Sequence, residues 1–326
     1  MIIAFIQRAV MLGIPLLFGS TGEIITEKSG HLNLGTAGVM YVGGICGVIG
    51  SFLYETNTAA FNPALAVIIP LLSSILGSAV CGLIYSFLTV TLRANQNVTG
   101  LALTTFGVGF GNFFGGSLIK LSGNTEIPSI ALSATSKVFK TTLPFASKLG
   151  VIGDIFFSYS ALAYVAIIIA FIASWYFKRT RSGLHLRSIG ENPATADAAG
   201  INVTAYKYGA TVIGSVIAGL GGLYYVMDYA NGVWSNDGFG DRGWLAIALV
   251  IFAVWRPNLS IIGSIVFGGL LIIHNYIPNT TFSGMELIKM TPYAVTILVL
   301  IFVSMRRKRE NQPPASLGLS YFREDR

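Results

Sequence analysis

Long apolar runs recur along this chain, and short polar segments separate them. Nine of these runs approach the roughly 20 residues that a helix needs to cross the hydrocarbon core of a bilayer. They lie at residues 3–22, 32–53, 64–91, 97–118, 159–177, 206–230, 244–256, 259–277 and 287–305. The pattern predicts an all-α, polytopic membrane helical bundle of about nine spans, within a range of eight to ten.

The two halves of the chain share a pattern: a glycine-rich polar segment leads into an apolar run, and a proline follows. In the first half S-G-H-L-N-L-G at 29–35 is followed by Pro63, and in the second half D-G-F-G-D-R-G at 237–243 is followed by Pro257. Glycine-interrupted segments at matching positions of two inverted halves point to a substrate path in transporters. We therefore expect an inverted four-plus-four repeat joined by one linking helix, with chance similarity of membrane helices as the alternative.

Composition and charge fit a membrane protein. The 326 residues are 53% hydrophobic and 11% charged, whereas soluble domains carry about 25% charged residues. The net charge is +7, but eleven of the 21 Lys and Arg residues lie at 178–207 or from 306 onward, where they flank apolar runs. This distribution does not predict binding to nucleic acid. Because basic loops stay in the cytoplasm, it predicts a cell-membrane protein with its C-terminus inside and its N-terminus outside.

This topology gives a single transmembrane domain with two connecting loops and a tail. The predicted parts are the domain at 1–305, repeats at about 1–118 and 206–305, an external loop at 119–158, a cytoplasmic loop at 178–205 and a basic cytoplasmic tail at 306–326. The external loop is interpreted either as a docking site for an outside partner or as a simple connector.

Carboxylates and catalytic motifs are scarce within the predicted spans. Glu23 and Glu27 are assigned to the inner loop, and Asp228 to an outer helix end. Ion-coupled carriers place such groups inside the membrane. The chain also lacks the phosphate-loop, H-E-x-x-H and G-x-S-x-G motifs. We therefore expect a transport protein that is not an enzyme and needs no cofactor or metal, with an ATP-independent carrier or channel as the alternative class.

The loop after the fifth span carries the signals of a short helix. Asn192 can cap such a helix, Pro193 suits its first position, and Gly200 can end it. A helix this short needs tertiary support. It is interpreted either as a projection that docks into a groove of a soluble protein or as a connector between two spans.

The sequence G-E-N-P-A-T-A-D-A-A-G-I at 190–201 resembles the coupling segment of ABC-importer permeases of the branched-chain amino acid/ribose/nucleoside class. Residues 22–38, 93–103 and 240–252 resemble other segments of the same family. The resemblance covers about 5–305 and is closest to the nucleoside and simple-sugar permeases. Ala37, where the family pattern has an acidic residue, and the inserted Asp241 are departures from it.

The resemblance implies several partners. They are ATP-binding cassette ATPase subunits, a second permease interpreted as a different chain, and an extracytoplasmic substrate-binding lipoprotein. The cargo would be a nucleoside, with a simple sugar or a branched-chain amino acid as alternatives. Coupling to the ATPases would involve Arg187, Glu191, Asn192, Pro193, Ala196, Asp197, Ala199 and Gly200.

Residues of the substrate path are expected among amides, hydroxyls and aromatic rings of the spans and their glycine-rich leads. Asn and Thr can hydrogen-bond hydroxyls or a base edge, and aromatic rings can stack on a sugar or base. The candidates are Asn33, Thr36, Asn97, Thr104, Phe106, Trp234, Asn236, Phe239 and Trp244. The scarcity of membrane charge favours a small neutral polar solute. For each aromatic residue, anchoring at the membrane boundary is the alternative.

Overall fold

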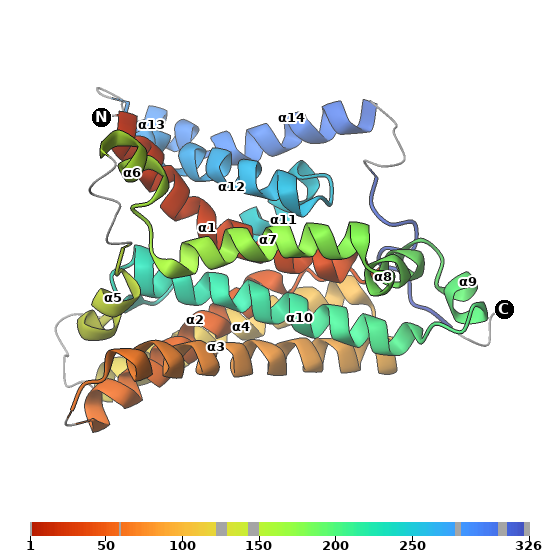
Figure 1. The fold of residues 1–326 in the computed structure, drawn as a ribbon, viewed down its shortest axis with the longest axis horizontal. Helices are drawn as coiled ribbons and strands as arrows, with labels where there is room; N and C mark the ends of the chain where they lie inside the picture. The colour runs from red at the N-terminus through yellow and green to blue at the C-terminus, as the bar shows by residue number, and fades with distance from the viewer. Residues whose placement is uncertain are drawn as a thin grey trace.

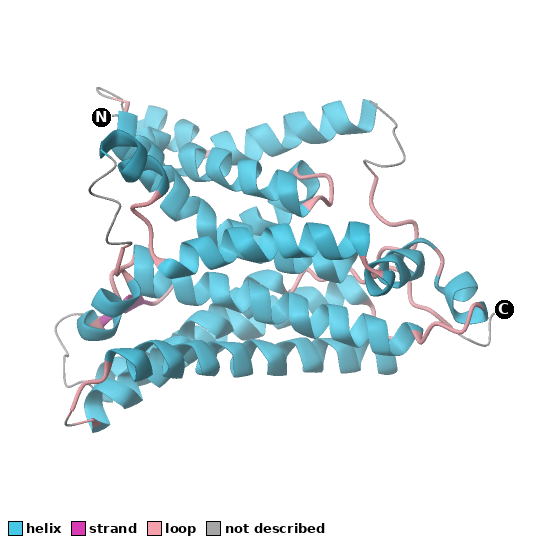
Figure 2. Ribbon diagram, in the orientation of Figure 1, coloured by secondary structure: helices cyan, strands magenta, loops and turns pink. Residues whose placement is uncertain are grey.

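The computed structural model describes residues 2–58, 60–121, 129–142, 150–277, 282–305 and 312–322. Seven helical segments in these ranges are long and apolar enough to cross a membrane, and two shorter apolar helices accompany them. The nine lie in the same order as the nine predicted runs. The chain is therefore a helical multi-pass membrane bundle, as its sequence predicts (Figure 2).

The long helices have these bounds: Ile2–Glu27 (α1), Thr36–Asn57 (α2), Pro63–Ser86 (α3) with a π-helical end at Phe87–Thr91, Gln96–Leu121 (α4), Ala161–Arg179 (α7), Val203–Tyr224 (α10) with a π-helical end at Tyr225–Tyr229, and Pro257–Ile272 (α12) with a 3-10 end at Ile273–Asn275. The shorter apolar helices are Arg242–Phe252 (α11) and Thr291–Met305 (α14). The remaining elements are Ser129–Ala131 (β1), Ser133–Phe139 (α5), Gly150–Phe156 (α6), Arg181–Glu191 (α8), Pro193–Ala198 (α9), Val233–Ser235 (β2) and Phe282–Lys289 (α13).

The long helices run between two ends of the molecule (Figure 1). We call these the α8/α9 end, where the C-terminal segment also lies, and the α5/α6 end, where the N-terminus and α13 lie. At the α5/α6 end, β1 pairs antiparallel with β2, with Ile130 opposite Trp234. The predicted external loop is thus partly ordered and tied to the segment that leads into α11, although 122–128 and 143–149 lie outside the described residues.

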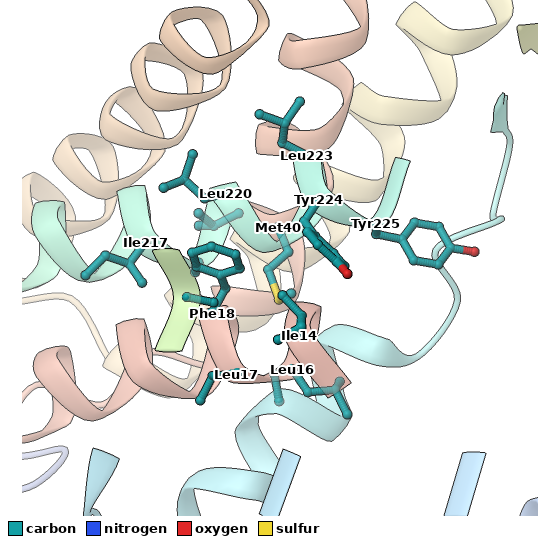
Figure 3. Packing of buried hydrophobic residues seen from close by; sticks show 14 of the residues in the cluster. Ile14, Leu16, Leu17, Phe18, Met40, Ile217, Leu220, Leu223, Tyr224 and Tyr225 are labelled. Carbon is teal, nitrogen blue, oxygen red and sulfur yellow. The ribbon is translucent and has the colours of Figure 1, made fainter. Parts of the chain in front are cut away.

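Helices α1 and α10 form the centre of the bundle and cross through glycines. A Cβ on Gly22 would collide with the carbonyl oxygen of Gly214, and a Cβ on Gly214 would collide with that of Gly22. Small residues of this kind let helix backbones approach closely within a membrane, where apolar burial does not drive helix association. Beside the crossing, Phe18 of α1 and Met40 of α2 lie against α10 near Leu220 (Figure 3).

Two differences from the predicted boundaries affect the interior of the bundle. The first span does not end at residue 22: α1 continues to Glu27, so Glu23 and Glu27 belong to a buried helix rather than to an inner loop. Asp228 lies in the π-helical end of α10 and is also buried. In the seventh predicted run the helix ends at Phe252, because Val254 and Trp255 turn the backbone with φ near +52°.

Candidate functional site

The helices α2 and α11 begin against each other in the interior of the molecule. A Cβ on Gly243, in the first turn of α11, would collide with the backbone of Ala37 in the first turn of α2. Each helix follows a non-helical segment, 28–35 before α2 and 230–241, which includes β2, before α11. We call these the first and second lead segments. The first contains, and the second overlaps, the two glycine-rich segments at 29–35 and 237–243 that the sequence predicts to border a path.

Three predicted path residues lie together at the first lead segment. Asn33 accepts a hydrogen bond from the Gly35 amide at 2.9 Å through its side chain, which shapes the turn into α2. Thr104 of α4 donates to the Leu34 carbonyl at 2.8 Å. Thr36 donates to a carboxylate oxygen of Glu23. Asn33, Thr36 and Thr104 are all buried, and these hydrogen bonds hold the segment in place.

The carboxylates of Glu23 and Glu27 connect this lead segment to the α11–α12 corner. The Asn33 amide donates to Glu23 Oε1 at 3.1 Å, and the Trp255 indole N–H donates to Glu27 Oε2. Glu23 and Glu27 are 1% and 4% exposed. Sequence reasoning missed this role. The available signal was their spacing of four residues, which places both on one face of a helix that continues the first apolar run.

An aromatic cluster forms at the second lead segment. Tyr41 of α2 makes edge contacts with Trp234 and Phe239, at centroid distances of 6.0 and 5.4 Å. Tyr225 makes an edge contact with Phe239 at 5.1 Å, and the Arg242 guanidinium lies 4.6 Å from the Tyr225 ring centre. A cavity of about 180 Å³ opens beside these rings. Tyr41, Tyr225 and Arg242 were not predicted.

The cluster contains two buried donors without a hydrogen-bond partner among the described residues. They are the indole N–H of Trp234, which lies against Gly115 of α4, and Nε of Arg242. Leaving such donors unpaired costs free energy, so an acceptor that reached either of them would be bound favourably. Nearby, Asn112 of α4 donates to Asp237 at 2.9 Å, and the exposed Asn236 lies beside α4.

The other predicted path residues lie neither with the polar residues at the first lead segment nor in the aromatic cluster at the second. Asn97 and Phe106 are exposed on α4, on the side away from its buried glycines, and Trp244 is half-buried on α11. Helix periodicity explains the difference, because α4 turns Gly100, Thr104 and Gly107 toward α2 and so turns Asn97 and Phe106 outward.

The predicted short helix is present as α9, with the predicted ends. The Asn192 side chain accepts from the Thr195 amide at 3.0 Å, Pro193 occupies the first turn, and Gly200 has a φ of +82° just beyond the end. Ala196 is buried against Ile189 and Val203. The exposed members of the predicted coupling set are Arg187, Glu191, Asn192, Ala199 and Gly200, while Asp197 is half-buried.

The C-terminal segment 312–322 lies across the α8/α9 end, a contact that the sequence did not predict. The Ser316 amide donates to the Gly190 carbonyl at 3.0 Å, and the Tyr321 hydroxyl donates to Asp197 at 2.9 Å. Gly318 donates to the Gly30 carbonyl at 3.3 Å. The segment therefore joins α8, α9 and the first lead segment. The apolar residues within the basic tail were the only sequence feature that could have indicated this contact. The basic cluster 306–309 lies outside the described residues.

Lys28 lies between the end of α1 and α8. Burial, followed by the charge of Arg187, lowers the pKa of the Lys28 ammonium from 10.5 to about 8. The unfolded chain therefore holds a proton that the folded chain lacks between about pH 8 and pH 10.5, and folding becomes more favourable as the pH rises through this window.

This shift gives a pH prediction. We expect the melting temperature of the purified protein to rise less between pH 8 and pH 10 in Lys28→Met than in the unsubstituted protein. Lys178→Met, which removes an exposed lysine at the same end, is the control and should keep the full rise. Equal slopes for Lys28→Met and the unsubstituted protein would contradict the assignment of the shift to Lys28.

Comparison with known proteins gives consistent matches over most of the chain. The family model described as branched-chain amino acid transport system / permease component matches residues 5–304. The nucleoside ABC transporter permease protein NupC of Lactococcus lactis is 30% identical over 290 residues, covering 88% of this chain and 87% of that protein. The guanosine ABC transporter permease protein NupQ of Bacillus subtilis is 30% identical over 296 residues, with the same coverage of 88% and 87%. A Haloferax volcanii protein provisionally named as a glucose ABC transporter permease is 28% identical over 339 residues, covering 98% of this chain and 97% of that protein.

Proposed function

This chain belongs to the family of branched-chain amino acid transport system permease components, and on that premise we propose that it forms the membrane path of an ATP-driven importer for a nucleoside. The chain is the permease subunit of an ABC importer and is not itself catalytic. Nucleoside cargo is the finer proposal. Its main support is the aromatic cluster at the second lead segment, together with the nucleoside and guanosine permeases among the relatives.

The proposed architecture has nine spans in a single domain, with α1–α4 as one repeat, α10, α11, α12 and α14 as the inverted other, and α7 as the link. Under this pairing α1 corresponds to α10, and α3 corresponds to α12. The contacts fit such a two-fold relation, because α1 meets α12 as extensively as α10 meets α3. The mutual crossing of Gly22 and Gly214 and the meeting of the first turns of α2 and α11 also fit it.

The proposed orientation puts the α8/α9 end in the cytoplasm and the N-terminus outside. Lys178, Arg179 and Arg181 lie at the junction of α7 and α8, and positively charged loops of this kind remain on the cytoplasmic side. The tail would then be cytoplasmic as well. With this orientation, the aromatic cluster lies toward the outer half of the membrane and the first lead segment toward the inner half.

The proposed path runs from the aromatic cluster toward the first lead segment. Tyr41, Trp234 and Phe239 offer ring faces and edges for a base or a sugar, and stacking of a base on an aromatic ring is tolerant of its identity. The unpaired Trp234 N–H offers a donor. Asn97 and Phe106 face outward on α4. This position suits a path that is bordered on that side by a second permease. We propose that the second permease is a different chain.

The proposed partners meet opposite ends of the chain. ABC ATPase subunits would bind α9, whose exposed residues project from the bundle. The buried Ala196 packs α9 against α8 and the start of α10. An extracytoplasmic binding lipoprotein would meet the α5/α6 end, where β1 and β2 link the external loop to the second lead segment. A movement at either end could thus reach a lead segment through direct contacts.

The provisional glucose permease among the relatives keeps a simple sugar as the second candidate cargo. The decisive experiment is uptake of radiolabelled guanosine and glucose in cells with and without this chain. We expect chain-dependent guanosine uptake that excess unlabelled nucleoside suppresses and excess glucose does not. Chain-dependent glucose uptake that nucleosides leave unchanged would overturn the nucleoside assignment in favour of a sugar.

A further inference from the structure

A cavity of about 410 Å³ lies at the α8/α9 end, where it touches the first lead segment through His31 but includes none of the proposed path residues. Its walls come from the end of α3, the start of α4, the α9–α10 junction and the last residues of the C-terminal segment. The α9–α10 junction and the C-terminal segment can be followed in Figure 1. The cavity is large enough for a small solute and is lined mostly by polar groups.

Lys207 of α10 is the most unusual group in this cavity. Its side chain is 3% exposed, yet it has no carboxylate within 4.0 Å among the described residues. A buried charge is expensive unless a partner of opposite sign compensates it. Asp197 also lines the cavity; its carboxylate accepts the hydroxyl of Tyr321 and forms no ion pair with Lys207 within 4.0 Å.

His31 adds no second positive charge to the cavity. The Thr89 hydroxyl donates a hydrogen bond to the Tyr85 carbonyl at 2.6 Å. It therefore accepts a hydrogen bond from His31 Nε2 at 2.7 Å. Nδ1 of His31 then accepts from the Thr211 hydroxyl at 2.8 Å, and both ring nitrogens are satisfied in the neutral form. Burial and the charge of Lys207 lower the pKa of His31 to about 3, in agreement with a neutral ring. Lys207 therefore carries the buried positive charge of this cavity, without an ion pair among the described residues.

Two backbone amides and one guanidinium group belong to residues that line the same cavity. Helix α10 begins here, and the amides of Val203 and Thr204 have no partner in the part of the chain that the structure describes. The start of a helix attracts anions through these amides and the helix dipole. Arg93 lines the cavity as well, with its guanidinium held 4.6 Å from the ring centre of Phe322 in the C-terminal segment.

We propose that this cavity binds a phosphate group through Lys207, Arg93 and the first amides of α10. A phosphate supplies a negatively charged partner for the Lys207 ammonium. Its oxygens also accept hydrogen bonds from several donors at once. The group can belong to a soluble phosphate compound or to a lipid headgroup, because the chemistry of recognition is the same. A bound phosphate would join α10 to the C-terminal segment and thereby stabilise the junction from which α9 projects.

The test measures binding and does not depend on transport. The purified chain is placed in nanodiscs of phosphatidylcholine, and its melting temperature is followed as inorganic phosphate replaces chloride at constant ionic strength. A ligand that binds only the folded state raises the melting temperature saturably. In a second arm, nanodiscs containing phosphatidic acid replace soluble phosphate, so that a rise in only one arm identifies the source.

We expect a saturable rise for the unsubstituted chain in at least one arm, and at least a tenfold weaker response for Lys207→Met. Lys178→Met removes an exposed lysine at the same end and should respond like the unsubstituted chain. Thr204→Glu places a carboxylate at an exposed position of the cavity wall, and it should abolish the response without disturbing the fold. This second variant keeps the test valid if Lys207→Met does not fold.

Absence of any rise in both arms would overturn the proposal. An equal rise in the unsubstituted chain, Lys207→Met and Thr204→Glu would also overturn it, because the phosphate would then bind elsewhere. Neither outcome bears on the proposed cargo, which is measured by uptake.

Discussion

Replacement of Ala199 by tryptophan is expected to abolish ATP-coupled uptake while leaving the protein folded. Ala199 is exposed at the end of α9, so a bulky side chain there can extend into solvent. If α9 seats in a groove of the ATPase, an indole at this position prevents close contact. Loss of 1.4 kcal/mol of docking energy already weakens binding tenfold, and a steric clash should exceed that amount.

The measurement compares uptake with the amount of folded protein in the membrane. Arg179→Trp provides the matched control, because it adds the same side chain at an exposed position of the same end, outside α8 and α9. We expect uptake to persist in Arg179→Trp and to fall at least tenfold in Ala199→Trp at equal abundance. Undiminished uptake in Ala199→Trp would show that α9 is only a connector between two spans.

Replacement of Glu23 by leucine is expected to destabilise the folded protein strongly, whereas glutamine should be tolerated. Leucine removes the acceptor of the Asn33 amide, and an unsatisfied buried amide costs roughly 1–3 kcal/mol. Glutamine retains one carbonyl oxygen for that amide. Its NH2 group can donate to Thr36, whose own hydroxyl can turn to the Asn33 carbonyl, 3.2 Å away.

Melting temperatures of the purified variants test this ordering. Glu286→Leu is the control, because Glu286 forms an exposed pair with Lys289 and such pairs contribute little to stability. We expect the order Glu23→Leu well below Glu23→Gln, with Glu286→Leu near the unsubstituted protein. Equal melting temperatures for Glu23→Leu and Glu286→Leu would contradict the role of Glu23 in holding the first lead segment.

The helical bundle and α9 were predictable because each has a local signal. Runs of about 20 apolar residues identify candidate spans by composition alone, and each of the nine runs overlaps one of the seven span-length helices or the two shorter apolar helices. Asn192, Pro193 and Gly200 act on the backbone within a few residues of themselves, so the bounds of α9 follow from the sequence. The glycine-rich segments were also identifiable, since each lacks the continuous apolar pattern of a span.

Long-range contacts explain what the sequence did not predict. The charges of Glu23 and Glu27 suggested a loop, but partners as distant as Trp255 satisfy them inside the bundle. Tyr41 and Tyr225 look like ordinary span residues until the fold brings them to Phe239. The C-terminal segment was predicted only as part of a basic cytoplasmic tail, because its own sequence does not reveal that α8 and α9 present matching carbonyl and carboxylate groups.

We expect this permease to move its cargo only when partner subunits hydrolyse ATP. The most direct measurement is uptake into proteoliposomes that contain the chain with its co-purifying subunits and binding protein, with ATP enclosed on the α8/α9 side. We expect accumulation that requires ATP and that vanadate abolishes. Accumulation by the chain alone, unchanged by ATP or vanadate, would contradict it and identify an independent carrier or channel.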